Sequence, residues 1–281
     1  MSRIVYVNGE YLPEEDAKIS VFDRGFLFAD GVYEVTSVLD GRLIDNAGHL
    51  ARLQRSLDEL RMASPLPMTE IEAAQREVVR RNGLVEGALY LQVSRGAADR
   101  DFAFPKDARP SLVMFTQAKN LSANPAAAKG WSVITIEDIR WKRRDIKTVQ
   151  LLAPSLAKQA ALDAGADDAW LIEDGYVTEG TSNNAWIVKG GKLITRPASS
   201  AILHGITRRA VMRLAAEDGI GFEERLFTAD EAKAADEAFV TSATSFVMPV
   251  VRIDETLIGN GNPGSVTMRL RELYLEEARK A

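Results

Sequence analysis

Two short segments of the chain carry residue types that could do chemistry together. Lys147 lies in residues 143–148 (Arg-Arg-Asp-Ile-Lys-Thr), and about thirty residues later Glu179 lies in residues 177–183 (Val-Thr-Glu-Gly-Thr-Ser-Asn). A lysine that bonds to an aldehyde must first be a neutral amine, and clustered positive charge favours that form. A carboxylate beside a Gly-Thr-Ser turn can contact the protonated ring nitrogen of a pyridine cofactor. The pair predicts a pyridoxal phosphate site, in which Lys147 anchors the aldehyde and Glu179 keeps the ring electron-poor.

The first part of the chain is predicted to hold hairpins, two helices and further strands. Asn8-Gly9 and Asp40-Gly41 are flanked by alternating apolar residues, which is the strongest local cue for a hairpin. Helices are predicted over 48–62, where leucines recur at helical spacing, and over 69–82, with Thr69 as the N-cap. Strands are predicted over 88–94 and 111–116.

A change of composition predicts a division into domains. Residues 119–129 are rich in Ala, Asn and Ser and show no strand pattern, so we interpret them as a linker. We expect an N-terminal α/β domain over 1–118 and a C-terminal α/β domain over 130–281 that carries Lys147.

The C-terminal part alternates strands and helices. The predicted strands are 131–136 and 237–241, the predicted helices are 155–164, 207–217 and 265–279, and Asp174-Gly175 and Gly190-Gly191 predict hairpins. Because hairpins join antiparallel strands, we expect an α/β fold with mixed, α+β-like sheets instead of purely parallel ones.

The composition excludes several kinds of site and partner. The chain has 281 residues, no cysteine and two histidines, which rules out disulfides, thiolate chemistry and a His-rich metal site, so we expect no metal. We interpret His49 and His204 as packed or capping residues. The net charge of −5 with interspersed signs argues against a nucleic-acid surface, and no apolar run is long enough for a membrane span. The N-terminus shows no signal-peptide pattern, so we expect a cytoplasmic protein.

Taken in order, these segments resemble the branched-chain/D-amino-acid aminotransferase superfamily, the fold-type IV (class IV) pyridoxal phosphate enzymes. The likeness runs from Asp23-Arg24-Gly25 to Gly264, and it is greatest to the branch that acts on D-amino acids. The resemblance implies a two-domain fold-type IV architecture, with Lys147 as the Schiff-base lysine that also moves the substrate's α-proton. It implies that Glu179 holds the pyridine nitrogen.

The resemblance also implies a set of cofactor contacts. Arg52 matches the phosphate arginine, whose guanidinium suits a bidentate contact. Two turns match the family's phosphate-binding segments, and other positions match groups near the ring: the implied residues are Gly205, Ile206 and Thr207 at a helix start, Ser242 and Ala243 in the second turn, Leu203 against the ring, and Thr181, Ser182 and Asn183 beside Glu179. Each has an ordinary alternative, such as an exposed helix arginine for Arg52 or a plain N-cap for Thr207.

For the substrate, the resemblance points to Tyr33 and Arg100. Tyr33 matches an active-site tyrosine of the D-amino-acid enzymes, and Arg100 matches an arginine that reaches across a homodimer interface to bind the substrate carboxylate. The usual pattern there is Arg-x-His, but this chain has Phe102 in place of the histidine. The missing donor could cost on the order of 1–3 kcal/mol of substrate binding, or it could reflect a different substrate.

We therefore expect ping-pong transamination of D-amino acids such as D-alanine with a 2-oxo acid, through pyridoxamine phosphate. An (R)-selective amine transaminase, an L-branched-chain aminotransferase and an aminodeoxychorismate lyase remain alternatives on the same fold. A non-enzymatic module on this fold is a further alternative, and it predicts a colourless protein. The implied partners are small-molecule amino acids and 2-oxo acids and a second copy of the chain.

Overall fold

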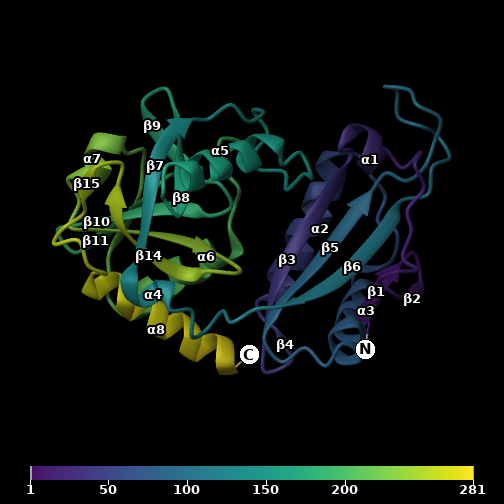
Figure 1. The fold of residues 1–281 in the computed structure, drawn as a ribbon, viewed down its shortest axis with the longest axis horizontal. Helices are drawn as coiled ribbons and strands as arrows, with labels where there is room; N and C mark the ends of the chain where they lie inside the picture. The colour runs from purple at the N-terminus through teal and green to yellow at the C-terminus, as the bar shows by residue number, and fades with distance from the viewer. Residues whose placement is uncertain (1, 281) are drawn as a thin grey trace. The chain divides into compact units, whose positions relative to one another are not determined.

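The computed structural model describes residues 2–280 and divides into two compact units (Figure 1). The first unit comprises the chain up to Asn120 together with Ile146–Gln150, and the second comprises Leu121–Asp145 and Leu151–Lys280. Within the described residues, no helix is long and apolar enough to cross a membrane.

The first unit is built on a six-stranded sheet. Its strands are β1 (Ile4–Val7), β2 (Glu10–Pro13), β3 (Gly31–Leu39), β4 (Arg42–Leu43), β5 (Gly87–Ser94) and β6 (Ser111–Ala118), and its helices are α1 (Arg24–Phe28), α2 (Asn46–Glu59) and α3 (Met68–Arg81). The strand order is β2-β1-β6-β5-β3-β4, and every neighbouring pair is antiparallel.

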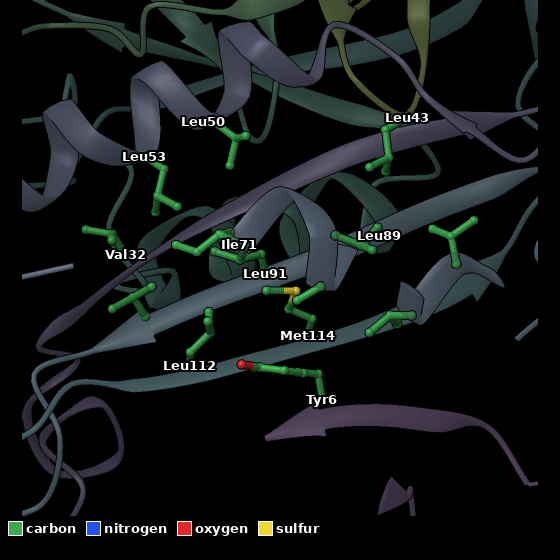
Figure 2. Packing of buried hydrophobic residues seen from close by; sticks show 14 of the residues in the cluster. Tyr6, Val32, Leu43, Leu50, Leu53, Ile71, Leu89, Leu91, Leu112 and Met114 are labelled. Atoms are coloured by element: carbon green, nitrogen blue, oxygen red, sulfur yellow. The ribbon is translucent and has the colours of Figure 1, made fainter. Parts of the chain in front are cut away.

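One face of this sheet forms the core of the unit. Alternate residues of β5, such as Leu89 and Leu91, are fully buried, as the period-two pattern requires. In Figure 2, Leu50 and Leu53 point from α2 toward these strand residues. Helix α2 begins close to the predicted position, but α3 begins at Met68 after Pro67, so Thr69 is not its N-cap.

The second unit is built on a nine-stranded mixed sheet. Its strands are β7 (Trp131–Glu137), β8 (Asp168–Glu173), β9 (Tyr176–Gly180), β10 (Asn184–Lys189), β11 (Lys192–Thr195), β12 (Phe222–Glu224), β13 (Glu237–Ser242), β14 (Phe246–Ile253) and β15 (Thr256–Leu257). Its helices are α4 (Ala126–Lys129), α5 (Leu152–Asp163), α6 (Ile206–Glu217), α7 (Ala229–Lys233) and α8 (Ser265–Lys280). The order is β12-β11-β10-β13-β14-β7-β8-β9, and β15 pairs with β14.

Both parallel and antiparallel pairs occur in the second sheet, which confirms the predicted mixed α/β fold. Strands β14, β7 and β8 pair in parallel, whereas the hairpins at Asp174-Gly175 and Gly190-Gly191 join antiparallel strands. Helix α8 (yellow in Figure 1) packs along β14. The segment expected to be a structureless linker contains the short helix α4.

Candidate active site

Lys147 lies in a segment that adds to the first unit. The backbone N–H of Tyr33 donates to the carbonyl of Lys147 at 3.0 Å, and Val149 donates to Gly31 at 3.0 Å. These bonds use the part of β3 that β4 does not pair with. We expected Lys147 in the C-terminal domain from its position in the sequence, but contacts group it with the first unit because Ile146–Gln150 pairs with β3 and buries Ile146 in that core.

The side chains of Lys147 and Tyr33 meet. The Lys147 Nζ lies 4.1 Å from the centre of the Tyr33 ring. Tyr33 stacks on Tyr90 with ring centres 5.6 Å apart, and Tyr90 stacks on Phe115 at 4.8 Å. These three half-buried rings lie on the face of the sheet opposite the helical core, because their positions alternate with core residues such as Val32. The structure thus brings together the predicted covalent lysine, the predicted substrate tyrosine and an aromatic surface.

The basic residues before Lys147 are paired with carboxylates. Lys142 and Arg144 bond to Glu173 at 2.5 and 2.8 Å, and Arg143 bonds to Asp145 at 3.0 Å. Their charges are therefore compensated locally, and the sequence argument from clustered positive charge does not hold.

Arg52 is buried and engaged by a carboxylate on β3. Its Nε and Nη2 donate to the two oxygens of Glu34 at 2.8 and 2.7 Å, and His49 Nδ1 lies 2.8 Å from the same carboxylate. Burial opposes the ionisation of Glu34, but Arg52 and His49 outweigh burial and lower its pKa to about 2. The structure confirms that His49 is a packed residue. Arg52 is fixed in place by this network, and its role toward a phosphate stays a prediction.

Arg100 lies in an exposed loop among aromatic rings. Its guanidinium carbon is 5.2 Å from the centre of Phe28 and 5.8 Å from that of Phe102. Arg24 fixes the loop, because its Nη1 donates to the carbonyl of Asp101 at 2.5 Å while its Nε bonds to Asp30 at 2.8 Å. Among the described residues, Arg100 forms no ion pair with the aspartates on either side of it.

Glu179 is buried in the second unit and is surrounded by donors. Arg140 Nη1 donates to it at 2.6 Å, the backbone N–H of Leu203 at 3.1 Å and Asn184 Nδ2 at 3.1 Å. Burial raises the pKa of Glu179, whereas Arg140 lowers it, and the balance leaves the pKa above its usual value. Leu203, predicted as a wall of the cofactor ring, thus also positions the carboxylate through its backbone.

Arg140 is itself held by a second carboxylate. Its Nε and Nη2 donate to Asp138 at 2.9 and 2.7 Å, and the hydroxyl of Thr178 donates to the same carboxylate at 2.7 Å. Arg140 and Asn184 were missed by the sequence analysis. Asn184 is adjacent to the predicted turn, which was the available signal, but nothing local marks Arg140, which lies 39 residues from its partner Glu179.

The turn after Glu179 is fixed from below by Asp168. Thr181 donates to one oxygen of Asp168 at 2.5 Å and Asn183 Nδ2 to the other at 2.7 Å. The Thr181 and Asn183 side chains therefore stabilise the turn, as predicted in part. Ser182 lies exposed between them.

Two further turns of the second unit present backbone N–H groups. Helix α6 begins at Ile206 and Thr207, its N-cap Gly205 provides no side-chain acceptor, and its first turn holds no acidic residue. A methyl group on Gly205 would overlap the amide oxygen of Asn184, so the close approach requires glycine. The second turn, with Ser242 and Ala243, joins β13 to β14 and is half-buried.

These residues fit pyridoxal phosphate. The buried carboxylate of Glu179 suits a protonated ring nitrogen, and the uncapped start of α6 suits an anion. Lys147 supplies the amine. Among the described residues, no cluster of His, Asp and Glu is arranged to hold a metal ion.

Known proteins resemble this chain along most of its length. The family model described as amino-transferase class IV matches residues 31–253. D-alanine aminotransferase from Staphylococcus epidermidis is 37% identical over 269 residues, which is 95% of each chain. D-alanine aminotransferase from Bacillus licheniformis is 39% identical over 267 residues, or 95% of this chain and 94% of the relative. A solved structure of a branched-chain amino acid aminotransferase (organism given as T.th.), complexed with N-(5′-phosphopyridoxyl)-L-glutamate, is 30% identical with a TM-score of 0.93 and covers 100% of this chain and 95% of its own.

Proposed function

The chain belongs to the amino-transferase class IV family, and we propose that it transfers amino groups from D-amino acids to 2-oxo acids with pyridoxal 5′-phosphate as its cofactor. D-alanine is the proposed donor, because curated relatives over 95% of the chain carry that activity in their names. The reaction is a ping-pong exchange: the donor leaves as a 2-oxo acid before the acceptor, pyruvate or 2-oxoglutarate, takes up the amino group.

The observation that carries the proposal is the environment of Glu179. A carboxylate that is buried and bonded to Arg140, Asn184 and the Leu203 N–H is held ready for a cationic ring nitrogen. The cofactor, when bound, supplies an aldehyde that links to amines and a ring that accepts electrons from the substrate α-carbon. Glu179 keeps the ring nitrogen protonated.

The remaining proposed roles belong to groups on the first unit and on the two turns. Lys147 Nζ removes the α-proton of the substrate and delivers it to C4′ of the cofactor. The N–H groups of Ile206, Thr207, Ser242 and Ala243, together with Arg52, bind the phosphate. Tyr33 lies beside Lys147 and orients the substrate, and Arg100 binds its carboxylate.

A homodimer is part of the proposal. The loop with Arg100 is exposed on its own chain, as are Phe26 and Phe102 nearby in the first unit, so a second copy would cover apolar surface there. In that assembly Arg100 serves the site of the partner subunit.

Two alternatives rest on specific observations. The solved structures most like this fold include branched-chain aminotransferases, which favours an L-amino acid donor. Phe102 replaces a donor of the carboxylate-binding pattern, which favours an amine without a carboxylate.

A half-reaction distinguishes these possibilities. D-alanine, L-leucine and (R)-1-phenylethylamine are added separately to the yellow holoenzyme without an acceptor, and the visible absorbance is followed. We expect D-alanine to remove the yellow band and to yield pyruvate and pyridoxamine phosphate in equal amounts. A response to L-leucine alone or to the amine alone would replace the proposal by the corresponding alternative, and pyruvate released without pyridoxamine phosphate would indicate the lyase.

A further inference from the structure

The turn that carries Ser242 and Ala243 is held in an unusual backbone conformation. Ser242 pairs with Phe246 across the hairpin, and the Ser242 hydroxyl accepts the N–H of Ser245 at 3.1 Å. Phe246 is fully buried and has a φ of 58°. This left-handed conformation is unfavourable for a bulky residue and persists only where the surroundings impose it.

Helix α8 supplies those surroundings from two positions one turn apart. The ring of Tyr274 packs on Phe246 with ring centres 5.4 Å apart. Arg271 donates from Nη1 to the carbonyls of Ser245 and Val247, at 3.0 and 2.8 Å, which are the residues on either side of Phe246. The helix therefore contacts three consecutive residues at the end of the turn.

The start of α8 is fixed to the same hairpin. The carboxylate of Glu237, the first residue of β13, accepts the N–H groups of Val266 and Thr267 at 3.0 and 2.8 Å. This contact sets the position of α8 against the β13–β14 hairpin and hence the reach of Arg271 toward the turn.

The charge of Arg271 is not cancelled. Its side chain is only 4% exposed, and its Nη2 donates to the carbonyls of Leu121 and Ser122, each at 3.2 Å. Within residues 2–280, its guanidinium thus bonds to four neutral carbonyls and to no carboxylate. Burial alone lowers its pKa, in contrast to Arg140, whose acidic partners raise the pKa against burial. A buried guanidinium without a counterion is costly, which calls for an anion from outside the chain.

We infer that Arg271 is a positioning residue for the cofactor phosphate: it fixes the Ser242–Ser245 turn from behind and leaves an uncompensated positive charge next to it. The inference rests on the proposed phosphate site at Ser242 and Ala243. Arg271 contacts only backbone of its own chain, so it acts through the turn and through its field, which is strong in a poorly solvated environment.

The test compares two ligands that differ only in the phosphate. Dissociation constants of pyridoxal 5′-phosphate and of pyridoxal are measured on the cofactor-free wild type, on Arg271→Met and on Arg269→Met, by visible absorbance. Arg269 lies on the same helix but is exposed and paired with Asp218, which makes it the matched control. Thermal unfolding of each cofactor-free protein is recorded in parallel.

We expect Arg271→Met to bind pyridoxal 5′-phosphate about ten- to a hundredfold more weakly, and pyridoxal less than about threefold more weakly. Arg269→Met should match the wild type for both ligands. Equal weakening of both ligands, or no weakening of either, would overturn the inference. A wild-type protein that takes up neither ligand would remove the proposed function itself, and the inference with it.

A second variant keeps the test valid if Arg271→Met does not fold. Arg271→Lys retains the charge but cannot reach four carbonyls in a forked geometry. Selective weakening of pyridoxal 5′-phosphate over pyridoxal supports the inference in this variant too, and wild-type binding of both ligands overturns it.

Discussion

The ionisation of Glu179 depends on one neighbouring side chain. Burial raises the pKa of this carboxyl, and the guanidinium of Arg140 is the largest influence that opposes burial. Asp138 holds Arg140 in a bidentate contact and keeps it directed at Glu179. A protonated Glu179 could not hold a cationic ring nitrogen, so the proposed chemistry depends on Arg140 as a positioning residue.

The first prediction concerns Arg140→Met. Activity requires ionised Glu179, so it is lost as the pH falls through the pKa of that group. Removing Arg140 raises the pKa further, so the acid limb of the kcat profile should move to higher pH and kcat at pH 7 should fall by at least about tenfold. Arg140→Lys, which keeps the charge, should show a smaller shift. An acid limb at its wild-type position in Arg140→Met would contradict the assignment.

Phe102 is the second residue that a single substitution can test. Its ring lies in the Arg100 loop and is 79% exposed in the single chain, so a histidine fits there without disturbing a core. If Arg100 binds the substrate carboxylate, Phe102→His should add a donor and lower KM for D-alanine by about three- to tenfold, with kcat nearly unchanged. Phe26→His, at another exposed phenylalanine of the first unit, is the control. An unchanged KM would place carboxylate recognition elsewhere.

Single residues differ in how far the sequence reveals them. Lys147 and Glu179 could be proposed because their residue types and order carry chemistry by themselves. Arg140 could not, because its function arises from a pairing across 39 residues that no local pattern encodes. The same reason hides Arg271, whose helical position is indistinguishable in the sequence from that of exposed Arg269.

Among the elements, β3 and α2 are joined by a buried ionic cluster. Glu34 on β3 accepts from Arg52 and His49 on α2, and all three side chains are buried. The pKa of Glu34 is lowered from 4.5 to about 2, so the ionised cluster stabilises the fold above pH ~4.5 and this contribution is lost as the pH falls toward 2.

Glu34→Gln tests this cluster as a third prediction. The substitution leaves buried Arg52 without a counterion, so the free energy of unfolding at pH 7 should fall by about 3 kcal/mol. Urea unfolding at several pH values measures it, and the difference from the wild type should shrink between pH 4.5 and 2. Glu72→Gln, which removes an exposed helical pair with Arg76, should have little effect. A pH-independent difference would show that packing, not charge, is responsible.

A fourth prediction concerns the start of α6. In Gly205→Ala the new methyl group would overlap Asn184, which donates to Glu179, so one substitution should disturb both the helix start and the carboxylate. We expect pyridoxal 5′-phosphate to bind at least about tenfold more weakly. Gly221→Ala, where the nearest atom is 3.7 Å away, is the control. Wild-type affinity in Gly205→Ala would show that Asn184 can move without consequence.

The elements themselves were largely predictable from the sequence. Hairpin cues such as Asn8-Gly9 and helical leucine spacing act over a few residues, and the corresponding β1–β2 hairpin and α2 are present. The pairing of Ile146–Gln150 with β3 was not predictable, because five residues without alternation carry no strand pattern and the partner lies more than a hundred residues away.

At the scale of the whole molecule, the proposed assembly places Lys147 and Arg100 of one site on different chains. Both residues belong to the first unit of their own chain, and Arg100 lies in an exposed loop. In a homodimer with two-fold symmetry, each site would combine Lys147 of one protomer with Arg100 of its partner.

Mixed dimers test this arrangement as the last prediction. Lys147→Ala should be inactive, and Arg100→Ala should be nearly inactive at D-alanine concentrations far below its raised KM. When the two variants are unfolded, mixed and refolded together, random pairing gives mixed dimers in which one site has both residues intact, so about a quarter of wild-type activity should return. Mixing Lys147→Ala with a Lys147→Ala, Arg100→Ala double variant is the control and should remain inactive. If Arg100 serves its own chain, every site in the mixture lacks one of the two residues and no activity returns, because Lys147 and Arg100 are then never intact together.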